Sequence, residues 1–140
     1  MSTALTGQHI GRAHYAVRAL LERKLAPAGF GFETWIPLNA VGTGGPIPQP
    51  DLIAFVTGGL RISEQRARDG VTTLIEAGYL ATDEKHALAL TDSGRQLWTR
   101  ISDEVRPVTS YLFDGFTEAE KATAASVLLK VTERADAALG

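Results

Sequence analysis

The sequence predicts a mainly α-helical fold with one small β-hairpin, arranged as a winged helix-turn-helix with long helices at both ends. Near both ends of the chain, apolar residues recur every three or four positions, which is typical of amphipathic helices. Between them, residues 49–95 contain two short helical patterns around a Gly-Gly pair, then two brief β-like runs and a new helix start. Together these patterns predict a helical protein with a single hairpin.

Length and composition predict one globular domain, residues 1–140. The chain has 140 residues, of which 44% are hydrophobic and 21% charged, an ordinary balance for a soluble protein. It contains no cysteine, which excludes disulfides, thiol redox sensing and thiolate metal sites. No apolar run approaches the roughly 18 residues that span a bilayer, and the N-terminal stretch does not resemble a secretory signal. We therefore expect a cytoplasmic protein without a membrane partner.

The first predicted elements are two helices and a loop. Residues 8–25 form a helical pattern with one apolar face, which ends where a proline and two glycines follow. A shorter helix is predicted over residues 33–41, with Pro37 in its first turns, where a missing N–H is tolerated. Residues 42–50 are rich in glycine and proline, and they predict a loop with one extended pair at Ile47.

The central segment predicts two helices joined by a sharp turn. Residues 50–57 begin with a proline and an acid, which suit the start of a helix. The two glycines at 58–59 are expected to end that helix and permit the turn. A serine at position 63 caps the second helix, which runs to Ala77, and Gly78 supplies the left-handed backbone that helix ends favour.

The C-terminal part of the chain predicts two long helices. The first covers residues 91–113 and contains Pro107, so a kink or break is expected near Val105. Thr117 and Glu120 form a capping box at the start of the last helix. The apolar face of that helix is lined by Ala124, Leu128, Val131, Ala135 and Leu139.

The predicted helix of residues 63–77 has two distinct faces. At about 100° per residue, one narrow apolar stripe should face the core. This stripe comprises Ala67, Val71, Leu74 and Gly78. The other side carries hydrogen-bonding groups, and arginine and glutamine can pair with guanine and adenine edges through two bonds each. The candidate DNA-contacting residues on this helix are Ser63, Gln65, Arg66, Arg68, Asp69 and Thr72.

The hairpin connects residues 79–82 to residues 87–90 and would serve as a wing. At its tip, Lys85 and His86 are candidate contacts to a phosphate or the minor groove, whereas the two acids before them would be repelled by phosphates. Residues 50–100 contain six Arg or Lys against seven Asp or Glu, so this segment is not basic overall. A solvated helix face of mixed charge is therefore the alternative interpretation.

The order of these elements resembles the MarR family of winged helix-turn-helix repressors over nearly the whole chain. The resemblance rests on four strings, Asp51–Ala54, Leu60–Ser63, Leu74–Leu80 and Leu88–Arg95. It implies that residues 33–95 form the winged helix-turn-helix part, with the helix after Ser63 in the major groove. It also implies that residues 8–28 and 96–140 are dimerisation helices.

Two features depart from the family pattern. The wing is short, and no arginine lies between Arg68 and Arg95, whereas family members usually carry an Asp-Arg-Arg cluster there. Gly70 lies inside the presumed reading helix, where a glycine costs about 1 kcal/mol relative to alanine. Insertion of a wing arginine into the minor groove is therefore not expected, and tertiary packing should hold the helix.

The resemblance implies a homodimer that represses transcription at a palindromic promoter site, with reading helices about 34–36 Å apart. Many relatives respond to small aromatic or phenolic ligands, so such an effector is a candidate partner. The residues that could contact it are His14, Tyr15, Arg18, Trp35, Trp98 and Tyr111. The alternative is that the aromatic residues among them are ordinary core or interface residues.

Two other classes compete with a DNA-binding regulator. An enzyme is disfavoured, because the three histidines are dispersed and no hydrolase, zinc-protease, Walker or dinucleotide motif is present. No metal or cofactor is expected for the same reason. A winged helix that binds proteins and has lost DNA affinity is the second alternative, which the acidic balance and the short wing favour.

Overall fold

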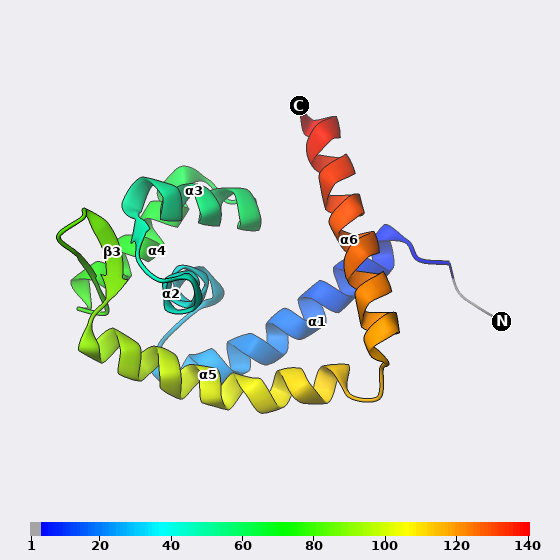
Figure 1. The fold of residues 1–140 in the computed structure, drawn as a ribbon, viewed down its shortest axis with the longest axis horizontal. Coiled ribbons are helices and arrows are strands. Elements are labelled where there is room, and N and C mark those ends of the chain that lie inside the picture. Colours follow the sequence, from blue (N-terminus) through cyan, green and yellow to red (C-terminus); the bar gives the residue numbers. More distant parts are fainter. Residues whose placement is uncertain (1–3) are drawn as a thin grey trace. The chain divides into compact units, whose positions relative to one another are not determined.

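The computed structural model describes residues 4–140 (Figure 1). Residues 1–3, which begin the stretch that does not resemble a secretory signal, lie outside the described residues. The chain divides into two compact units: unit one ends at Arg106, and unit two comprises residues 107–140. Each unit is described by itself below.

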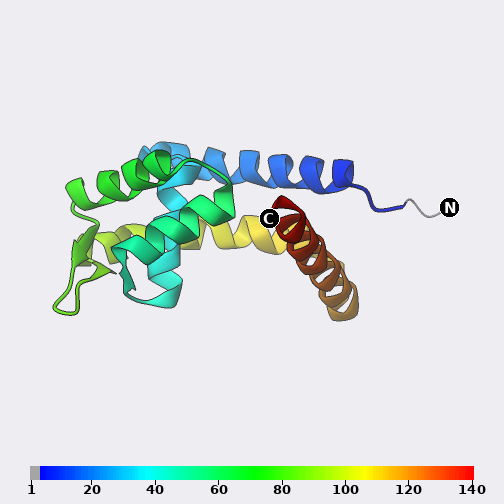
Figure 2. The ribbon, with the colours of Figure 1, turned by 90° about the horizontal axis from the view of Figure 1, so that it is seen from above.

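The predicted fold class is confirmed, because the chain is mainly helical with one small sheet. The helices are α1 (Gly7–Leu25), α2 (Phe32–Gly44), α3 (Gln49–Leu60), α4 (Glu64–Glu76), α5 (Asp92–Phe113) and α6 (Glu118–Leu139), with a 3-10 turn η1 (Ala26–Ala28) after α1. The strands are β1 (Ile47–Pro48), β2 (Leu80–Thr82) and β3 (Ala87–Leu90). In unit one, α2, α3 and α4 pack against one another beside the sheet, which Figures 1 and 2 show from two directions.

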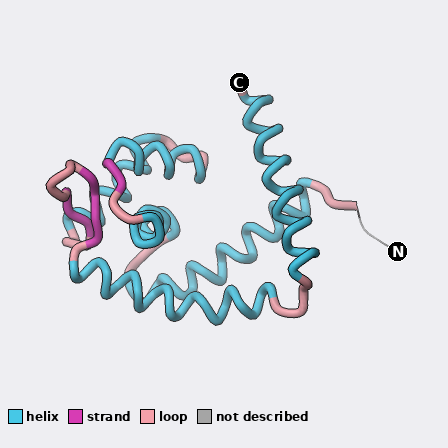
Figure 3. The backbone as a smooth tube through the Cα atoms, in the orientation of Figure 1, coloured by secondary structure: helices cyan, strands magenta, loops and turns pink. Residues whose placement is uncertain are grey.

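The sheet is antiparallel and has the strand order β1-β3-β2. The predicted β2–β3 hairpin is present, with Leu80 opposite Leu90. The extended pair expected at Ile47 is also present, and it adds a third strand by pairing Ile47 with Leu88 (Figure 3). Leu80 and Leu88 are buried, so the sheet fixes the base of the hairpin to the core while its tip remains exposed.

The core of unit one is built from apolar faces of α2, α3, α4 and α5, together with Leu25 at the end of α1 and the strand residues Leu80 and Leu88. Each fully buried aliphatic side chain contributes about 1.5–3 kcal/mol relative to exposure, so this cluster carries most of the stability of the unit. The largest buried side chains are Leu25, Leu38, Leu52, Val56, Val71, Leu74, Leu80, Leu88 and Ile101. The predicted core stripe of α4 is buried as expected, except for Gly78, which lies beyond the helix and is exposed.

The turn between α3 and α4 does not lie at the two glycines, residues 58–59, where the sequence predicted it. Helix α3 continues through Gly58 and Gly59 to Leu60, and neither glycine has a positive φ. The chain turns at Arg61, whose φ of 57° is left-handed and whose N–H donates to the Thr57 carbonyl. The prediction was wrong because Leu60 and Ile62, which flank the turn, both pack against the core and fix where it falls. At the end of α4, Gly78 does adopt the expected left-handed conformation, with φ of 82°.

Helix α2 runs three residues further than predicted and ends at Gly44. Gly42 lies inside it because the Trp98 indole of α5 packs directly on the position where a Cβ would be. The indole Nε1 also donates a hydrogen bond of 3.0 Å to the Asn39 side-chain oxygen. Glycines that the sequence assigned to a loop therefore extend the helix and allow α5 to pack closely against it.

Helix α5 begins as predicted, since the Thr91 hydroxyl accepts a 3.0 Å hydrogen bond from the Gly94 N–H. The Thr91 hydroxyl also donates to the carbonyl of Gly78 and so connects the end of α4 to the start of α5. Pro107 lies inside α5 without ending it, so of the kink or break expected near Val105, the break does not occur. The division between the two compact units nevertheless falls between Arg106 and Pro107.

Unit two contains the end of α5 and all of α6. The predicted capping box is confirmed: the Glu120 N–H donates to the Thr117 hydroxyl at 3.0 Å, and the Thr117 N–H donates to the Glu120 carboxylate at 2.9 Å. The second of these bonds, from the Thr117 backbone, holds the pKa of Glu120 below its usual value. No residue of α6 is buried in this chain, including the apolar residues of its predicted face.

Candidate nucleic-acid interface

Helix α4 is anchored at its start by its capping residue. The Ser63 hydroxyl accepts a hydrogen bond of 3.2 Å from the Arg66 N–H, which satisfies one of the free donors at a helix N-terminus. From there the helix buries Ala67, Val71 and Leu74 and exposes the polar side chains of its other faces. Of the candidate contacts on α4, Ser63, Gln65, Arg66, Arg68 and Asp69 are exposed and Thr72 is half-buried.

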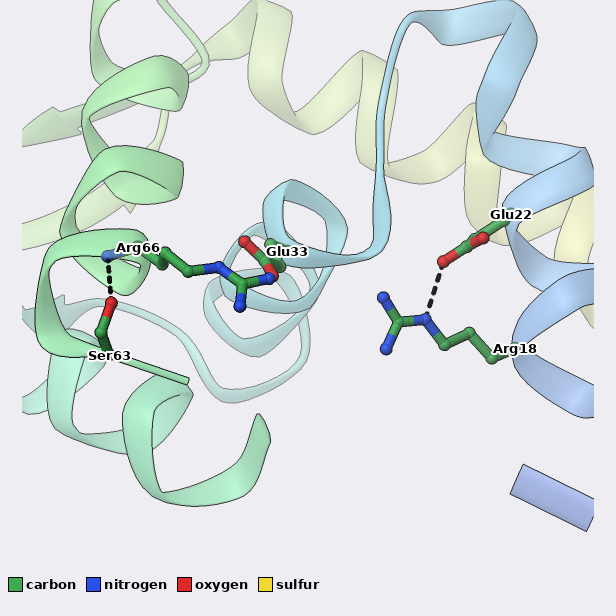
Figure 4. A network of polar contacts seen from close by, with 5 residues as sticks. All are labelled: Arg18, Glu22, Glu33, Ser63 and Arg66. Atoms are coloured by element: carbon green, nitrogen blue, oxygen red, sulfur yellow. Dashed lines mark hydrogen bonds and ion pairs between the residues drawn. The ribbon is translucent and has the colours of Figure 1, made fainter. Parts of the chain in front are cut away.

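The guanidinium of Arg66 forms an ion pair with the carboxylate of Glu33 in the first turn of α2 (Figure 4). The Arg66 side chain is 61% exposed, whereas that of Glu33 is 28% exposed. Figure 4 shows Arg66 extending from α4 to Glu33 at the start of α2. An arginine, a residue type that can pair with guanine through two hydrogen bonds, is thus held by a residue outside its own helix.

Gly70 explains how α4 comes so close to α2. A Cβ at this position would lie 2.8 Å from the backbone carbonyl oxygen of Glu33, closer than real Cβ contacts allow. The expected propensity cost of a glycine inside α4 is therefore offset by close packing of the two helices. Gly70 and Arg66 are four residues apart, so both contact the same residue, Glu33, from one face of α4.

The other arginine and the glutamine among the candidate DNA contacts on α4 also have acidic partners. Gln65 Nε2 donates to the Asp69 carboxylate at 2.7 Å, and Arg68 Nη2 donates to the Glu64 carboxylate at 2.7 Å. Both pairs are exposed and span four residues of one helix, so each contributes only about 0.2–0.5 kcal/mol. A stronger partner such as a phosphate or a guanine edge can therefore displace these acids at small cost.

The wing tip has an ordered turn. The Asp83 carboxylate accepts hydrogen bonds from the N–H groups of Lys85 (2.8 Å) and Ala87 (2.9 Å). His86 then adopts a left-handed conformation with φ of 63°. Because its carboxylate is engaged by these two N–H groups, Asp83 belongs to the turn itself, while the side chains of Lys85 and His86 are exposed.

Three of the candidate effector contacts gather where α1 lies beside the start of α2. The Arg18 guanidinium carbon lies 4.5 Å from the centre of the Phe32 ring, and its Nε pairs with Glu22 at 2.7 Å. The His14 ring packs edge-on against both Tyr15 and Phe32. A hollow of about 530 Å³ beside this group is lined by Arg18, Glu22, Ala26, Phe30, Gly31, Phe32, Glu33 and Thr34.

The remaining effector candidates lie elsewhere. Trp35 is 5% exposed and belongs to the core, and Trp98 packs on Gly42 as described above. Neither lines the hollow beside Arg18. Tyr111 belongs to unit two and is 79% exposed.

Sequence reasoning missed Phe32 and Glu33 as site residues. Glu33 lies in the first turn of a helix capped by Gly31, where an acid is favoured by the helix dipole, so its pattern indicated only a helix start. Its partner Arg66 is 33 residues away, and no local spacing signals that pairing.

Within residues 4–140, no three or more histidine, aspartate or glutamate side chains are grouped so that they could hold a metal ion. Over the same residues, every helix is too short or too polar to cross a membrane.

No protein-family model matches the sequence, and no curated protein matches it. Solved structures match well. A Listeria monocytogenes protein assigned to the MarR family of transcriptional regulators, solved with a 26mer DNA, superposes with a TM-score of 0.76 at 22% identity, over 94% of this chain and 89% of that one. This chain has the MarR fold. MarR from E. coli in its reduced form gives a TM-score of 0.67 at 18% identity, over 93% of this chain and 95% of that one.

A third MarR structure carries a small ligand. A Mycobacterium tuberculosis MarR family protein in complex with p-aminosalicylic acid superposes with a TM-score of 0.69 at 20% identity, over 91% of this chain and 98% of that one. Each of these three matches covers more than nine tenths of this chain, which confirms the fold class expected from the sequence resemblance. Structures of the MarR fold therefore include one complex with DNA and one with a planar aromatic acid.

Proposed function

We propose that this protein is a sequence-specific DNA-binding transcriptional regulator of the MarR family, which acts as a homodimer in the cytoplasm. One observation carries the proposal: α4 has its apolar stripe in the core and its capped N-terminal turn and long polar side chains in solvent. A helix of this kind can enter the major groove with its N-terminal residues toward the bases. The complex of a similarly folded protein with DNA supports the same use of the fold.

The proposed DNA contacts are divided by chemistry. Arg66, Gln65 and Arg68 are proposed to read base edges, because their donors can form paired hydrogen bonds with guanine or adenine. Ser63, Asp69 and Thr72 complete the same surface. Lys85 and His86 of the wing are proposed to contact phosphates, which would fix register without reading sequence.

The homodimer is supported by apolar surface that the chain leaves uncovered in unit two. Phe113 and Phe116 are 51% and 55% exposed, and Leu128 of α6 is 43% exposed. They line a mainly apolar hollow of about 590 Å³ together with Ala124 and Ala125. Clustered exposure of this kind marks an interface, and a second copy of the chain supplies a self-complementary partner.

A symmetric dimer presents two α4 helices related by a two-fold axis. Its binding site is then a palindrome with half-sites about one helical turn, 34–36 Å, apart. Occupation of such a site within a promoter would block transcription, so we propose repression as the mode of action. A similarly folded protein assigned to the MarR family of transcriptional regulators supports this function over the enzyme alternative.

The hollow beside Arg18 supports a second, regulatory function for the same protein. An aromatic wall from Phe32, a flanking His14–Tyr15 pair and the cation of Arg18 are suited to a small aromatic acid. We propose that such an effector binds there and releases DNA. Binding of p-aminosalicylic acid by a similarly folded protein supports this ligand class.

A mobility-shift assay tests the proposal. The purified protein is mixed with the DNA upstream of its own gene and with a scrambled fragment of equal length and composition. The expected result is a complex with the upstream DNA at protein concentrations at least about a thousandfold below those needed for the scrambled fragment. Equal binding of both fragments, or none at low salt, would contradict it and favour the alternative of a protein-binding winged helix.

A further inference from the structure

The ion pair between Glu33 and Arg66 assigns a role to a residue outside the reading helix. Building on the proposed DNA-binding function, we infer that Glu33 is a positioning residue that fixes the guanidinium of Arg66 for base recognition and thereby sets operator specificity. Glu33 belongs to α2 and would act on DNA only through Arg66.

The geometry leaves Arg66 held on one side and open on the other. The guanidinium has five N–H donors, and the carboxylate of Glu33 engages Nη2. Within residues 4–140 no other side chain pairs with this guanidinium, and the side chain remains 61% exposed. Donors therefore remain available for a base edge while the acid restricts the orientation of the group.

Glu33 is itself firmly placed. It is 28% exposed, lies in the first turn of α2 and has its carbonyl oxygen against Gly70 of α4. The Ser63 cap fixes the Arg66 backbone at the same time. The arginine is thus restrained at its backbone and, through the ion pair, at its guanidinium, which lowers the rotamer entropy that DNA binding would remove.

The Gln65 and Arg68 pairs lie within α4, whereas the Arg66 pair joins α4 to α2. Arg68 and Gln65 pair with acids on α4 itself, four residues away, and these partners move with the helix. Glu33 instead connects the reading surface to α2, whose other face packs in the core. Only Arg66, of the three proposed readers, is therefore oriented by the body of unit one.

An acid could instead act as a competitor that withholds Arg66 from DNA. A competitor would lower affinity for every sequence, because any phosphate gains when the acid is removed. A positioning residue would raise discrimination among sequences. Removal of the acid should therefore raise the affinity for both DNAs if Glu33 is a competitor, and should lower the ratio of specific to non-specific affinity if Glu33 is a positioning residue.

The test measures the DNA affinities of wild type, Glu33→Ala and Glu33→Gln by fluorescence anisotropy at two salt concentrations. Each protein is titrated against the upstream DNA that wild type binds and against scrambled DNA. We expect Glu33→Ala to lower the ratio of specific to non-specific affinity about tenfold, the effect of one well-formed base contact. Glu33→Gln keeps an oxygen acceptor at the same reach and should recover part of that loss. Asp103→Ala is the matched control, because it removes an exposed acid that pairs with an arginine, Arg106, within α5.

Two further measurements separate positioning from loss of structure. In the Arg66→Ala background, Glu33→Ala should leave the ratio of specific to non-specific affinity unchanged. Thermal unfolding identifies any variant that fails to fold. The Arg66 side-chain Nε signal in NMR relaxation should be ordered in wild type without DNA and mobile in Glu33→Ala. An equal loss in the Arg66→Ala background, an unchanged ratio, or higher affinity for both DNAs would overturn the inference.

The experiment also distinguishes this inference from the proposed function. Selective binding by wild type with no change in Glu33→Ala overturns only the role of Glu33. Lack of selective binding by wild type overturns both.

Discussion

Gly70 of α4 lies directly against the backbone carbonyl of Glu33 in α2, with room for a hydrogen atom but not for a methyl group. Gly70→Ala would normally stabilise an exposed helix by about 1 kcal/mol. Here the added Cβ would lie 2.8 Å from that carbonyl oxygen, and relieving this contact should cost about 1–3 kcal/mol. We expect net destabilisation, seen as a lower urea midpoint.

Gly58→Ala provides the matched control for that substitution. Gly58 is also inside a helix, and nothing lies within 4 Å of the position of its Cβ. Its substitution should therefore raise the free energy of unfolding by about 0.5–1 kcal/mol. If Gly70→Ala and Gly58→Ala raise the free energy of unfolding by the same amount, the close approach of α4 to α2 at Gly70 is contradicted.

The left-handed residue at the wing tip provides a second stability prediction. His86 has φ of 63°, a conformation that costs a side-chain-bearing residue about 1–2 kcal/mol relative to glycine. His86→Gly should therefore raise the melting temperature slightly, or leave it unchanged if the histidine has local compensating contacts. A marked fall in melting temperature would contradict the turn geometry described for residues 83–87.

Lys85 tests whether the wing contacts DNA. If its ammonium neutralises one phosphate, Lys85→Ala should weaken binding to operator and scrambled DNA alike. The slope of log affinity against log salt concentration should fall in magnitude by about 0.9 per half-site. The measurement is the slope of log affinity against log salt concentration for wild type and variant. Identical slopes would show that Lys85 makes no phosphate contact.

The apolar face of unit two tests the homodimer. Leu128→Asp places a charge among the exposed Phe113, Phe116 and Ala124 side chains, where a partner subunit would have to bury it at high cost. We expect the wild type to be a dimer and the variant a monomer in light scattering coupled to gel filtration. A variant that remains a dimer at micromolar concentration would place the interface elsewhere. Glu133→Asp, a conservative change at an exposed position of α6, is a suitable control.

The capping box predicts a pH dependence for α6. Bonds from Thr117 lower the pKa of Glu120 in the folded chain, so this group stabilises the folded state above its unfolded pKa, and that contribution is lost as pH falls through the folded pKa. The loss should therefore occur at pH values below the ordinary pKa of a glutamate side chain. Glu120→Gln should remove this component of acid unfolding followed by circular dichroism. An unchanged acid transition would contradict it.

Periodicity was sufficient to predict the helices and the hairpin. The buried stripe of Ala67, Val71 and Leu74 follows from a 3.6-residue repeat, and Thr117 with Glu120 is a purely local signal. Local signals failed at Gly58 and Gly59, where packing of the flanking residues placed the turn at Arg61 instead. At Pro107, α5 continues without the break that was one of the two outcomes expected there.

The candidate site could be predicted only in part. The polar face of α4 follows from helical geometry, so its exposed residues were identifiable without a structure. The pairing of Arg66 with Glu33 and the close contact at Gly70 join residues more than 30 positions apart, and no spacing rule predicts them. Trp35 and Trp98 were indistinguishable by residue type from ligand-binding aromatics, and only the structure showed that they pack against other residues of unit one.

The central claim, that α4 reads bases, is tested most directly with Arg66→Ala. Affinities of wild type and variant are measured for the operator and for every single base-pair substitution within it. We expect wild type to discriminate at the position facing Arg66, and the variant to lose about 1–3 kcal/mol of affinity together with selectivity at that one position. A uniform loss across all sequences would make Arg66 a phosphate contact, and no loss at all would contradict base reading by α4.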